Sequence, residues 1–346
     1  MSIGSKTLAA AAVLTLACFA AAAQELRAGL PAASDMSAAR GARLLEGARA
    51  EGEVIAYSTA PPEDNKALTD AFTARTGVPV KLWRSSSEDI LQRAIAEARA
   101  GRPQADAFIN TGMGLEPLYR ENLLQPVVSP YTATLLPDAY PAHRQWVGVY
   151  LAALVQFYNT NLVKKSELPK TYDDLLDPRW SGKLAVEAAD FDWFQAVVEN
   201  IGRDKGLALF RDIVAKNRVS VRKGHSLLAN LVVAGEVPLA LTVYQFTAEQ
   251  LRASGAPVDW FAIPPAMAIQ VGVGVAREPR HPNAAVLFYD FLISEAQEVL
   301  QKRNFIPTRK DLAGKVAYPI KVQDAARVLD GAKEWEEIYR RTFGFR

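Results

Sequence analysis

The sequence is poor in the residues that build disulfide-linked or metal-linked scaffolds. Among 346 residues there are one cysteine, Cys18, and three histidines. A single cysteine cannot close a disulfide within the chain, and three histidines leave few partners for a metal-ligand cluster. His-Glu-x-x-His, Gly-x-Ser-x-Gly and P-loop patterns are absent. We therefore predict no catalytic residues, no metal ligands and no bound cofactor. An enzyme that uses paired carboxylates stays open as an alternative.

An excess of charge of one sign is also lacking. Lys and Arg number 40 against 38 Asp and Glu, which gives a net charge of +2. Without a strong positive field, nothing favours binding to nucleic acid or to an anionic membrane. Apolar residues make up 49% of the chain and charged residues 23%, which is typical of a globular protein. A chain of this length is expected to form about two domains.

Only one long hydrophobic run is present, at the N-terminus. It covers Leu8–Ala22 and ends in small residues just before Gln24. This pattern predicts a cleaved signal peptide over residues 1–23 and a mature exported protein. Cys18 lies inside the predicted signal, so the mature chain would contain no thiol. A lipoprotein anchor at Cys18 is the alternative, but Thr15 stands where lipoprotein signals usually carry leucine.

What the chain does contain is a repeated alternation of short apolar strands, polar loops and helices. The predicted strands cover residues 54–57, 78–83 and 105–109, and then 183–187, 218–221 and 237–242. Such alternation predicts mostly parallel sheets with helices on their faces. Two long apolar stretches, 146–159 and 258–276, separate or follow these sets, and we interpret them as segments that cross between two lobes.

We expect an α/β protein with two lobes, each a mostly parallel sheet flanked by helices, joined by two crossing segments. Lobe 1 would comprise residues 24–150 and 265–346, including the C-terminal helices, and lobe 2 would comprise residues 151–264. The loops that follow parallel strands lie along one edge of a sheet. The strand-end loops of both lobes can therefore face a cleft that closes by hinge motion.

Several separated motifs run in order from about residue 54 to residue 343. They are Tyr158–Val163, Leu168–Lys183, Arg222–His225, Gly235–Ala240, Ala248–Leu251, Gly255–Val258, His281–Ala285 and Ile306–Lys310. Together they resemble the periplasmic solute-binding proteins of ABC importers, and the ferric-ion-type extracellular solute-binding proteins in particular. The resemblance implies a type II periplasmic-binding-protein fold.

The resemblance also implies a role and partners. A monomeric receptor of this family binds a small-molecule solute and delivers it to a permease and an ATPase in the inner membrane. The same fold can present its solute to a membrane sensor instead, and the sequence does not separate these two roles.

One departure from the family bears on the solute. Ferric-binding members typically hold the metal with adjacent tyrosines, where this chain has Tyr244 followed by Gln245. Because a hard trivalent cation prefers several anionic oxygens, we expect a small polar organic solute that carries an oxyanion, with or without an amine. Ferric ion, alone or with a bridging anion, is the alternative.

Candidate ligand-binding residues in lobe 1 are hydroxyl and amide side chains between predicted strands and helices. They are Ser58, Thr59, Ser85, Ser86, Ser87, Asn110 and Thr111. Hydroxyls and free backbone N–H groups at such loops can hold an oxyanion. The same residue types commonly cap helices, and for each residue the two roles are evenly balanced.

Candidates in lobe 2 come from three loops. They are Asp192, Trp193, His225, Tyr244 and Gln245. Asp192 could meet a ligand amine, and the Trp193 ring could form a wall of the pocket. His225 could bind an anion when protonated, although a lone histidine is more often an ordinary loop donor. Tyr244 and Gln245 could orient the ligand with one hydroxyl and one amide.

Overall fold

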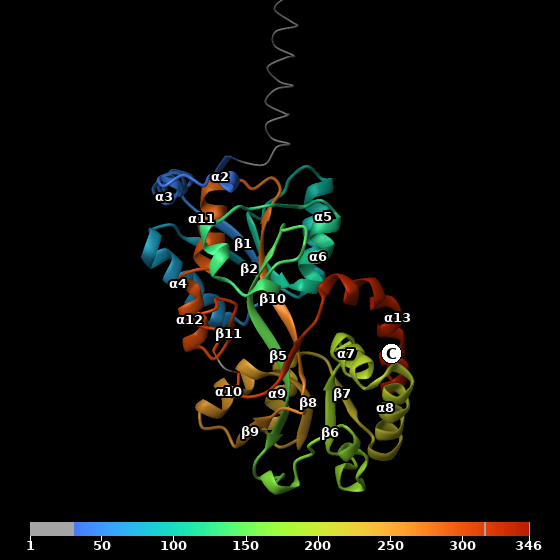
Figure 1. The fold of residues 1–346 in the computed structure, drawn as a ribbon. Coiled ribbons are helices and arrows are strands. Elements are labelled where there is room, and N and C mark those ends of the chain that lie inside the picture. Colours follow the sequence, from blue (N-terminus) through green and yellow to red (C-terminus); the bar gives the residue numbers. More distant parts are fainter. Residues whose placement is uncertain (1–30, 315, 346) are drawn as a thin grey trace, which may run out of the picture.

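The computed structural model describes residues 31–314 and 316–345, which form two lobes connected by long strands (Figure 1). The predicted signal peptide, with Cys18, lies outside these residues. Within the described ranges, none of the helices combines the length and apolar character needed to cross a membrane.

Lobe 1 is built on a sheet with the strand order β2, β1, β3, β10, β5. These strands are β1 (Val54–Ser58), β2 (Val80–Arg84), β3 (Ala107–Thr111), β5 (Val147–Asn159) and β10 (Ala266–Ala276). As the alternation predicts, β1 is parallel to both β2 and β3. In contrast, β10 is antiparallel to β3 and β5. Short strands β4 (Leu124–Gln125), β11 (Ile306–Pro307) and β12 (Ile320–Val322) pair with β10 or β5.

Helices flank the lobe 1 sheet (Figure 1). They are α2 (Pro31–Ser34), α3 (Arg40–Glu51), α4 (Pro62–Thr76), α5 (Ser87–Arg99), α6 (Gly112–Arg120), α11 (Pro282–Leu292) and α12 (Ala296–Lys302), with the 3₁₀ turns η1 (Pro130–Thr134) and η2 (Pro137–Ala139). The boundaries of α4 coincide with ordinary helix start and stop residues. Proline occupies its first turn, where the missing N–H costs nothing, and Gly77 ends it with a φ of 77°.

Lobe 2 repeats the same architecture with the strand order β5, β8, β6, β7. Its own strands are β6 (Leu184–Glu187), β7 (Ser220–Arg222), β8 (Leu239–Tyr244) and β9 (Val258–Phe261). Its helices are α7 (Phe191–Ile201), α8 (Arg203–Asn217), α9 (His225–Val233) and α10 (Gln245–Ala253), with 3₁₀ turns η3 (Lys165–Glu167), η4 (Asp173–Leu176) and η5 (Pro178–Trp180). β6 is parallel to both β7 and β8.

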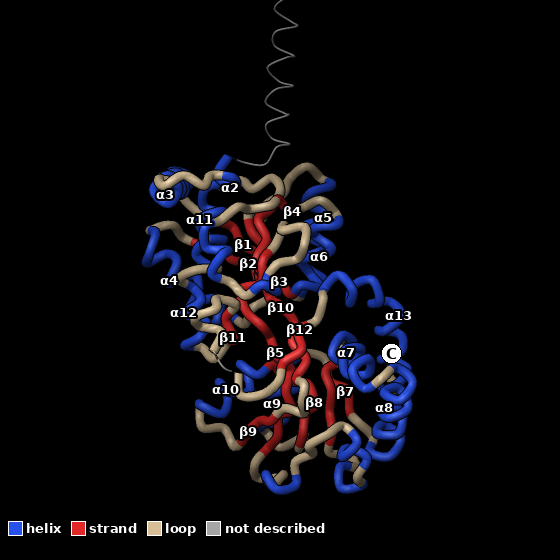
Figure 2. The backbone as a smooth tube through the Cα atoms, in the orientation of Figure 1, coloured by secondary structure: helices blue, strands red, loops and turns tan. Residues whose placement is uncertain are grey.

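The long strand β5 belongs to the sheets of both lobes. Its first half pairs with β10 and β11, and its second half pairs with β8 and β9. The continuous path of strands from one lobe into the other is visible in Figure 2. The prediction that the apolar stretch 146–159 crosses between lobes is therefore confirmed.

A bulge interrupts β5 where it lies against β10. Val271 pairs with Tyr150, but the next residue, Gly272, pairs with Gly148, so Val149 is an extra residue on the β5 side. A bulge of this kind bends the strand and changes the direction of the neighbouring side chains.

The C-terminal helix α13 (Ala325–Phe343) differs from its predicted place. The sequence analysis places all of residues 265–346 in lobe 1. In the structure, the apolar face of α13 packs into the core of lobe 2. That face consists of Trp335, Ile338, Tyr339 and Phe343, which recur at helical spacing. The pattern predicts an amphipathic helix, but it carries no information about which lobe receives the apolar face.

Loss of this packing should destabilise lobe 2. Phe343 is 5% exposed and contacts the rings of Phe194, Phe210 and Tyr339. We expect Phe343→Ala to lower the free energy of unfolding by about 3 kcal/mol, because it removes a buried ring and leaves a cavity. Denaturant unfolding followed by tryptophan fluorescence measures the loss, and Leu162→Ala, at a side chain that is 50% exposed, is the control. Equal stability of the two variants would contradict the docking of α13 on lobe 2.

Candidate functional site

Three strands of lobe 2 end at the same edge of its sheet and bring polar side chains together. Glu187 is the last residue of β6, His225 begins α9 after β7, and Tyr244 is the last residue of β8. Asp190 and Asp192 lie at the start of α7, which follows β6. The carboxyl ends of parallel strands are the usual place for ligands in such sheets.

The side chains in this group contact one another directly. His225 Nε2 lies 2.9 Å from Asp190 Oδ1, and the imidazole stacks on the Tyr244 ring at 4.4 Å. Glu187 Oε1 accepts the backbone N–H of Gly224 at 2.7 Å, and Gly224 has a φ of 106°, which favours glycine. One ligand atom from each of Glu187, Asp190 and His225 lies within 4.8 Å of the others. This spacing would allow all three residues to bind one metal ion.

The charges in this group are unbalanced. Burial raises the pKa of Glu187, and the charge of Asp190 raises it further. Burial followed by the charge of Asp190 raises the pKa of Asp192 to about 7. Burial acts to lower the pKa of His225, but Asp190, Glu187 and Asp192 together raise it to about 9. All three shifts favour the protonated form, so positive charge is stabilised at this side of the site, whether it is a proton or another cation.

One carboxyl oxygen at this place has no hydrogen-bond partner. Asp190 Oδ2 is buried without one. An unsatisfied buried oxygen costs free energy, and each case needs an explanation. A bound ligand would supply the missing partner.

Tyr150, which the sequence analysis does not single out, lies near this group. It lies on β5 in the part that belongs to lobe 1, and its ring packs edge-on against Phe305 at 4.6 Å and Phe246 at 6.3 Å. Burial and the carboxylates of lobe 2 raise the pKa of Tyr244, and Tyr150 is close enough to raise it further. The only signal in the sequence was a tyrosine within a long apolar crossing segment, which is also typical of a core residue.

An aromatic stack links this site to lobe 1. The Tyr244 ring is stacked on Phe246 at 5.5 Å, and Phe246 is stacked on Phe305 at 4.2 Å. Phe246 belongs to α10 of lobe 2, yet it is buried within the core of lobe 1. Tyr244 therefore lies at the junction of the lobes.

In lobe 1, most of the predicted ligand-binding side chains already have partners within the protein. Ser86 caps α5 by accepting the N–H of Asp89, and Thr111 caps α6 by accepting the N–H of Gly114. The other hydroxyls that bond to side chains are Ser58 to Asn65, Ser85 to Asp89 and Ser87 to Asn110. Ser86 and Thr111 thus have the capping role that the sequence left open, whereas Ser58, Ser85 and Ser87 are engaged in side-chain pairs. Thr59 is partly exposed.

Asn110 is different because its Nδ2 is buried without a partner. It lies at the end of β3, beside the first turns of α5 and α6. It is thus the one predicted lobe 1 side chain, within the described part of the chain, that leaves a buried donor unpaired. A role in binding a ligand stays a prediction for every residue of this set.

In lobe 2, one predicted ligand-binding residue lies in the core and the other four lie near the strand ends. Trp193 is fully buried and packs on Tyr172 and Phe210, so its ring belongs to the core and does not wall a pocket. The expectation that it lines the cleft is corrected, because its place on the inner face of α7 turns it away from the strand ends. His225 and Tyr244 are brought together, and Asp192 and Gln245 are partly exposed beside them.

The metal-ligand set was also missed by the sequence analysis. The sequence predicts a strand that ends at Glu187 and no metal ligands, and it gives no signal that singles out Asp190. The separation of Glu187 from His225 by 38 positions hides their contact, which arises only when β6 and β7 pair in parallel.

Residues 105–337 match the family model described as bacterial extracellular solute-binding protein. The chain belongs to this family. Its role is therefore that of the solute-binding component of a periplasmic ABC importer, as the motifs predicted. The two-lobed fold is confirmed by solved structures, which share it at low sequence identity.

Curated relatives of this solute-binding protein include two proteins named for iron. Iron uptake protein A1 of Synechocystis sp. is 28% identical over 289 residues, which cover 75% of this chain and 79% of the relative. The Fe(3+)-binding periplasmic protein of Serratia marcescens is 26% identical over 285 residues, which cover 79% and 82%. Both matches extend over most of each chain.

Among solved structures, iron-bound HitA from Pseudomonas aeruginosa has a TM-score of 0.71 and 22% identity, covering 84% of this chain and 99% of HitA. AfuA from Actinobacillus pleuropneumoniae, with fructose-6-phosphate bound, has a TM-score of 0.69 and 18% identity, covering 85% and 99%. At these identities the likeness shows the fold alone, and the two titles name different ligands.

The raised pKa of Asp192 predicts that this residue destabilises the folded protein when it is ionised. A carboxyl whose pKa is about 7 when folded, against 3.8 ordinarily, contributes stability at low pH that is lost as pH rises through that range. We expect Asp192→Asn to leave stability nearly unchanged at pH 4 and to raise the free energy of unfolding at pH 8 by roughly 1–3 kcal/mol.

Thermal or urea unfolding at both pH values measures this difference. Asp173→Asn, at an exposed carboxyl in η4, is the control and should change little at either pH. A destabilising effect of Asp192→Asn at pH 8 would contradict the assigned environment.

Proposed function

We propose that the solute of this receptor is ferric ion, held at the junction of the lobes by Glu187, Asp190, His225 and the hydroxyls of Tyr244 and Tyr150. The observation that carries the proposal is the convergence of ligand atoms from Glu187, Asp190 and His225 within 4.8 Å of one another, with the Tyr244 ring stacked on the imidazole and Asp190 Oδ2 left without a partner. Hard cations prefer oxygen ligands of this kind, and imidazole is also a ligand for iron.

The charge of lobe 2 argues in the same direction. Glu187, Asp190 and Asp192 outnumber the single imidazolium of His225. An organic oxyanion, the solute expected from the sequence, would meet repulsion from these carboxylates unless a cation accompanied it. The two iron-named relatives support the cation as the solute.

Tyr150 could replace the second tyrosine that ferric-binding members of the family carry next to the first. Adjacent tyrosines are absent, because Gln245 follows Tyr244. The second phenol can instead come from β5, since Tyr150 lies within electrostatic range of Tyr244. Both hydroxyls have raised pKa values because of burial and acidic neighbours. A bound trivalent cation reverses this effect, since its charge favours the phenolate.

The second candidate is an organic solute with a cationic group. Gln245 favours it, because an amide beside Tyr244 can orient an organic ligand and is a poor ligand for ferric ion. The acidic edge of lobe 2 would serve that solute equally well, so only a binding measurement separates the two.

The test is a titration of the chelator-treated protein with ferric citrate, followed by visible absorption and by thermal unfolding. Phenolate bound to ferric ion gives a charge-transfer colour, so we expect a coloured complex and an increase in thermal stability, about 2.7 kcal/mol at 100 times the dissociation constant. Tyr244→Phe should lose most of the colour, and Glu187→Gln should weaken binding at least about tenfold.

Tyr131→Phe, at an exposed tyrosine of η1, is the matched control and should bind as the unaltered protein does. Absence of colour and of stabilisation with ferric citrate would overturn the proposal. Stabilisation by amines or polyamines alone would establish the organic cation in its place.

A further inference from the structure

The bulge in β5 lies immediately before Tyr150. Val149 is the extra residue, so its carbonyl is displaced from the regular ladder with β10. On the other side of β5 the partner strand is β11, in which Pro307 is opposite Tyr150. Proline has no backbone N–H to donate. Pairing resumes one residue later, where the Thr308 N–H donates to the Val149 carbonyl at 3.2 Å, so the bulge is held on this side by a single backbone hydrogen bond next to Pro307.

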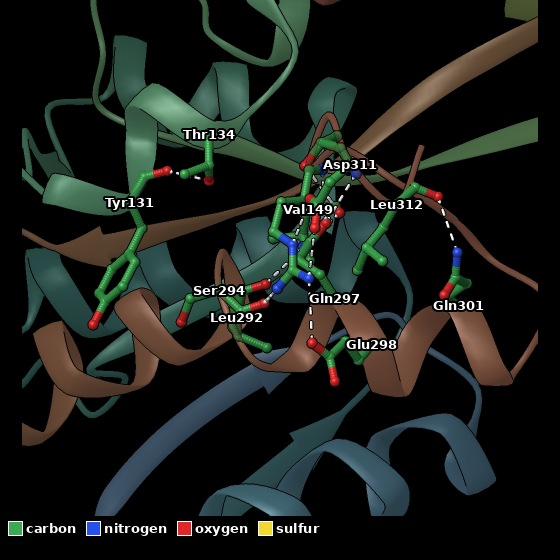
Figure 3. Close-up of polar contacts among 12 residues, drawn as sticks. Tyr131, Thr134, Val149, Leu292, Ser294, Gln297, Glu298, Gln301, Asp311 and Leu312 are labelled. Atoms are coloured by element: carbon green, nitrogen blue, oxygen red, sulfur yellow. Dashed lines mark hydrogen bonds and ion pairs between the residues drawn. The ribbon is translucent and has the colours of Figure 1, made fainter. Parts of the chain in front are cut away.

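Two buried side chains add further hydrogen bonds at the bulge. Gln297, on α12, donates from Nε2 to the Val149 carbonyl at 2.9 Å. Thr308, just after β11, places its Oγ1 2.7 Å from the Gly148 carbonyl and 3.1 Å from the Val149 carbonyl. Both side chains are completely buried. Figure 3 shows Gln297 reaching from its helix to Val149.

The Gln297 amide is fully used. Besides Val149, Nε2 donates to the Leu292 carbonyl at 2.8 Å, while Oε1 accepts the N–H groups of Thr308 and Arg309 at 2.9 and 3.1 Å. A primary amide has two donor hydrogens and two acceptor lone pairs. All four are engaged, so this side chain ties α12, the segment after β11 and the bulge to one another in a single geometry.

We propose that Gln297 and Thr308 are positioning residues for Tyr150: they hold the β5 bulge so that the Tyr150 hydroxyl faces the site at the lobe junction. The inference rests on the proposed function, in which Tyr150 contacts the solute. Neither residue touches the site itself. Their effect on binding is transmitted through the Gly148 and Val149 carbonyls to the next residue of the strand.

The variants are chosen to keep volume and remove hydrogen bonds. Gln297→Met and Thr308→Val remove the donors to Val149 and Gly148, whereas Thr308→Ser keeps the hydroxyl. Gln301→Met is the matched control, because Gln301 lies on the same helix and donates to the Leu312 carbonyl at 3.1 Å, away from the bulge. Tyr150→Phe provides the reference for complete loss of the hydroxyl.

The first measurement is the affinity for ferric citrate and the intensity of the charge-transfer band. We expect Gln297→Met and Thr308→Val to weaken binding about tenfold, and Thr308→Ser and Gln301→Met to change it less than about threefold. Because Gln297 and Thr308 act through Tyr150, adding Thr308→Val to Tyr150→Phe should cause no further loss of affinity. A purely structural role would give additive losses, and additive losses overturn the proposal.

The second measurement needs no ligand. Protein labelled with 3-fluorotyrosine gives a fluorine signal for Tyr150, which is assigned by its absence in Tyr150→Phe. We expect this signal to move in Gln297→Met and Thr308→Val but not in Gln301→Met. If the unaltered protein takes up no ferric ion, the proposed function fails. The fluorine signal then decides by itself whether Gln297 and Thr308 position Tyr150. If the unaltered protein binds ferric ion and Gln297→Met and Thr308→Val bind it equally well, the positioning role is wrong.

Discussion

The sharing of one strand by two sheets is the constraint on which the other features of the structure depend. β5 is hydrogen-bonded to β10 in lobe 1 and to β8 in lobe 2, so the two lobes cannot separate without breaking backbone pairs. Motion between them is restricted to bending of the crossing strands. The bulge at Val149 lies within β5, and Tyr244 at the end of β8 pairs with Leu154 of β5. The position of β5 therefore fixes where Tyr150 and Tyr244 lie.

The acidic edge of lobe 2 is maintained against an energetic cost. Burial and the neighbouring charge of Asp190 raise the pKa values of Glu187 and Asp192, and the buried Asp190 Oδ2 has no partner. The surrounding fold supports this arrangement through the Gly224 N–H and through Tyr339, which donates to the Glu187 carbonyl at 2.6 Å. A binding protein stores part of its affinity in such a site, because the solute relieves repulsion that the empty protein carries.

The sequence predicted those features that depend on local pattern. Strand and helix alternation, the Pro62 and Gly77 boundaries of α4 and the crossing at residues 146–159 all follow from residues near one another in the chain. The loops that hold Asp192, His225 and Tyr244 were located in the same way. Glu187, Asp190 and Tyr150 were not recognised, because their role depends on which strands pair and on where a bulge falls.

Two other differences have the same origin. A serine or threonine between a strand and a helix carries the same local signal whether it caps the helix or binds a solute, and the structure shows most of the lobe 1 set engaged as caps or in side-chain pairs. Trp193 and α13 have clear apolar faces, but amphipathicity does not specify the surface against which a face packs.

The aromatic stack of Tyr244, Phe246 and Phe305 gives the two lobes a shared set of side chains beside the site. Phe246 lies in the first turn of α10, directly after β8 of lobe 2, yet its ring is buried in the core of lobe 1. Tyr244 stacks on Phe246 and also on His225, so its ring contacts both lobes. Any bending between the lobes therefore has to be taken up at these ring stacks, beside the place where the solute would bind.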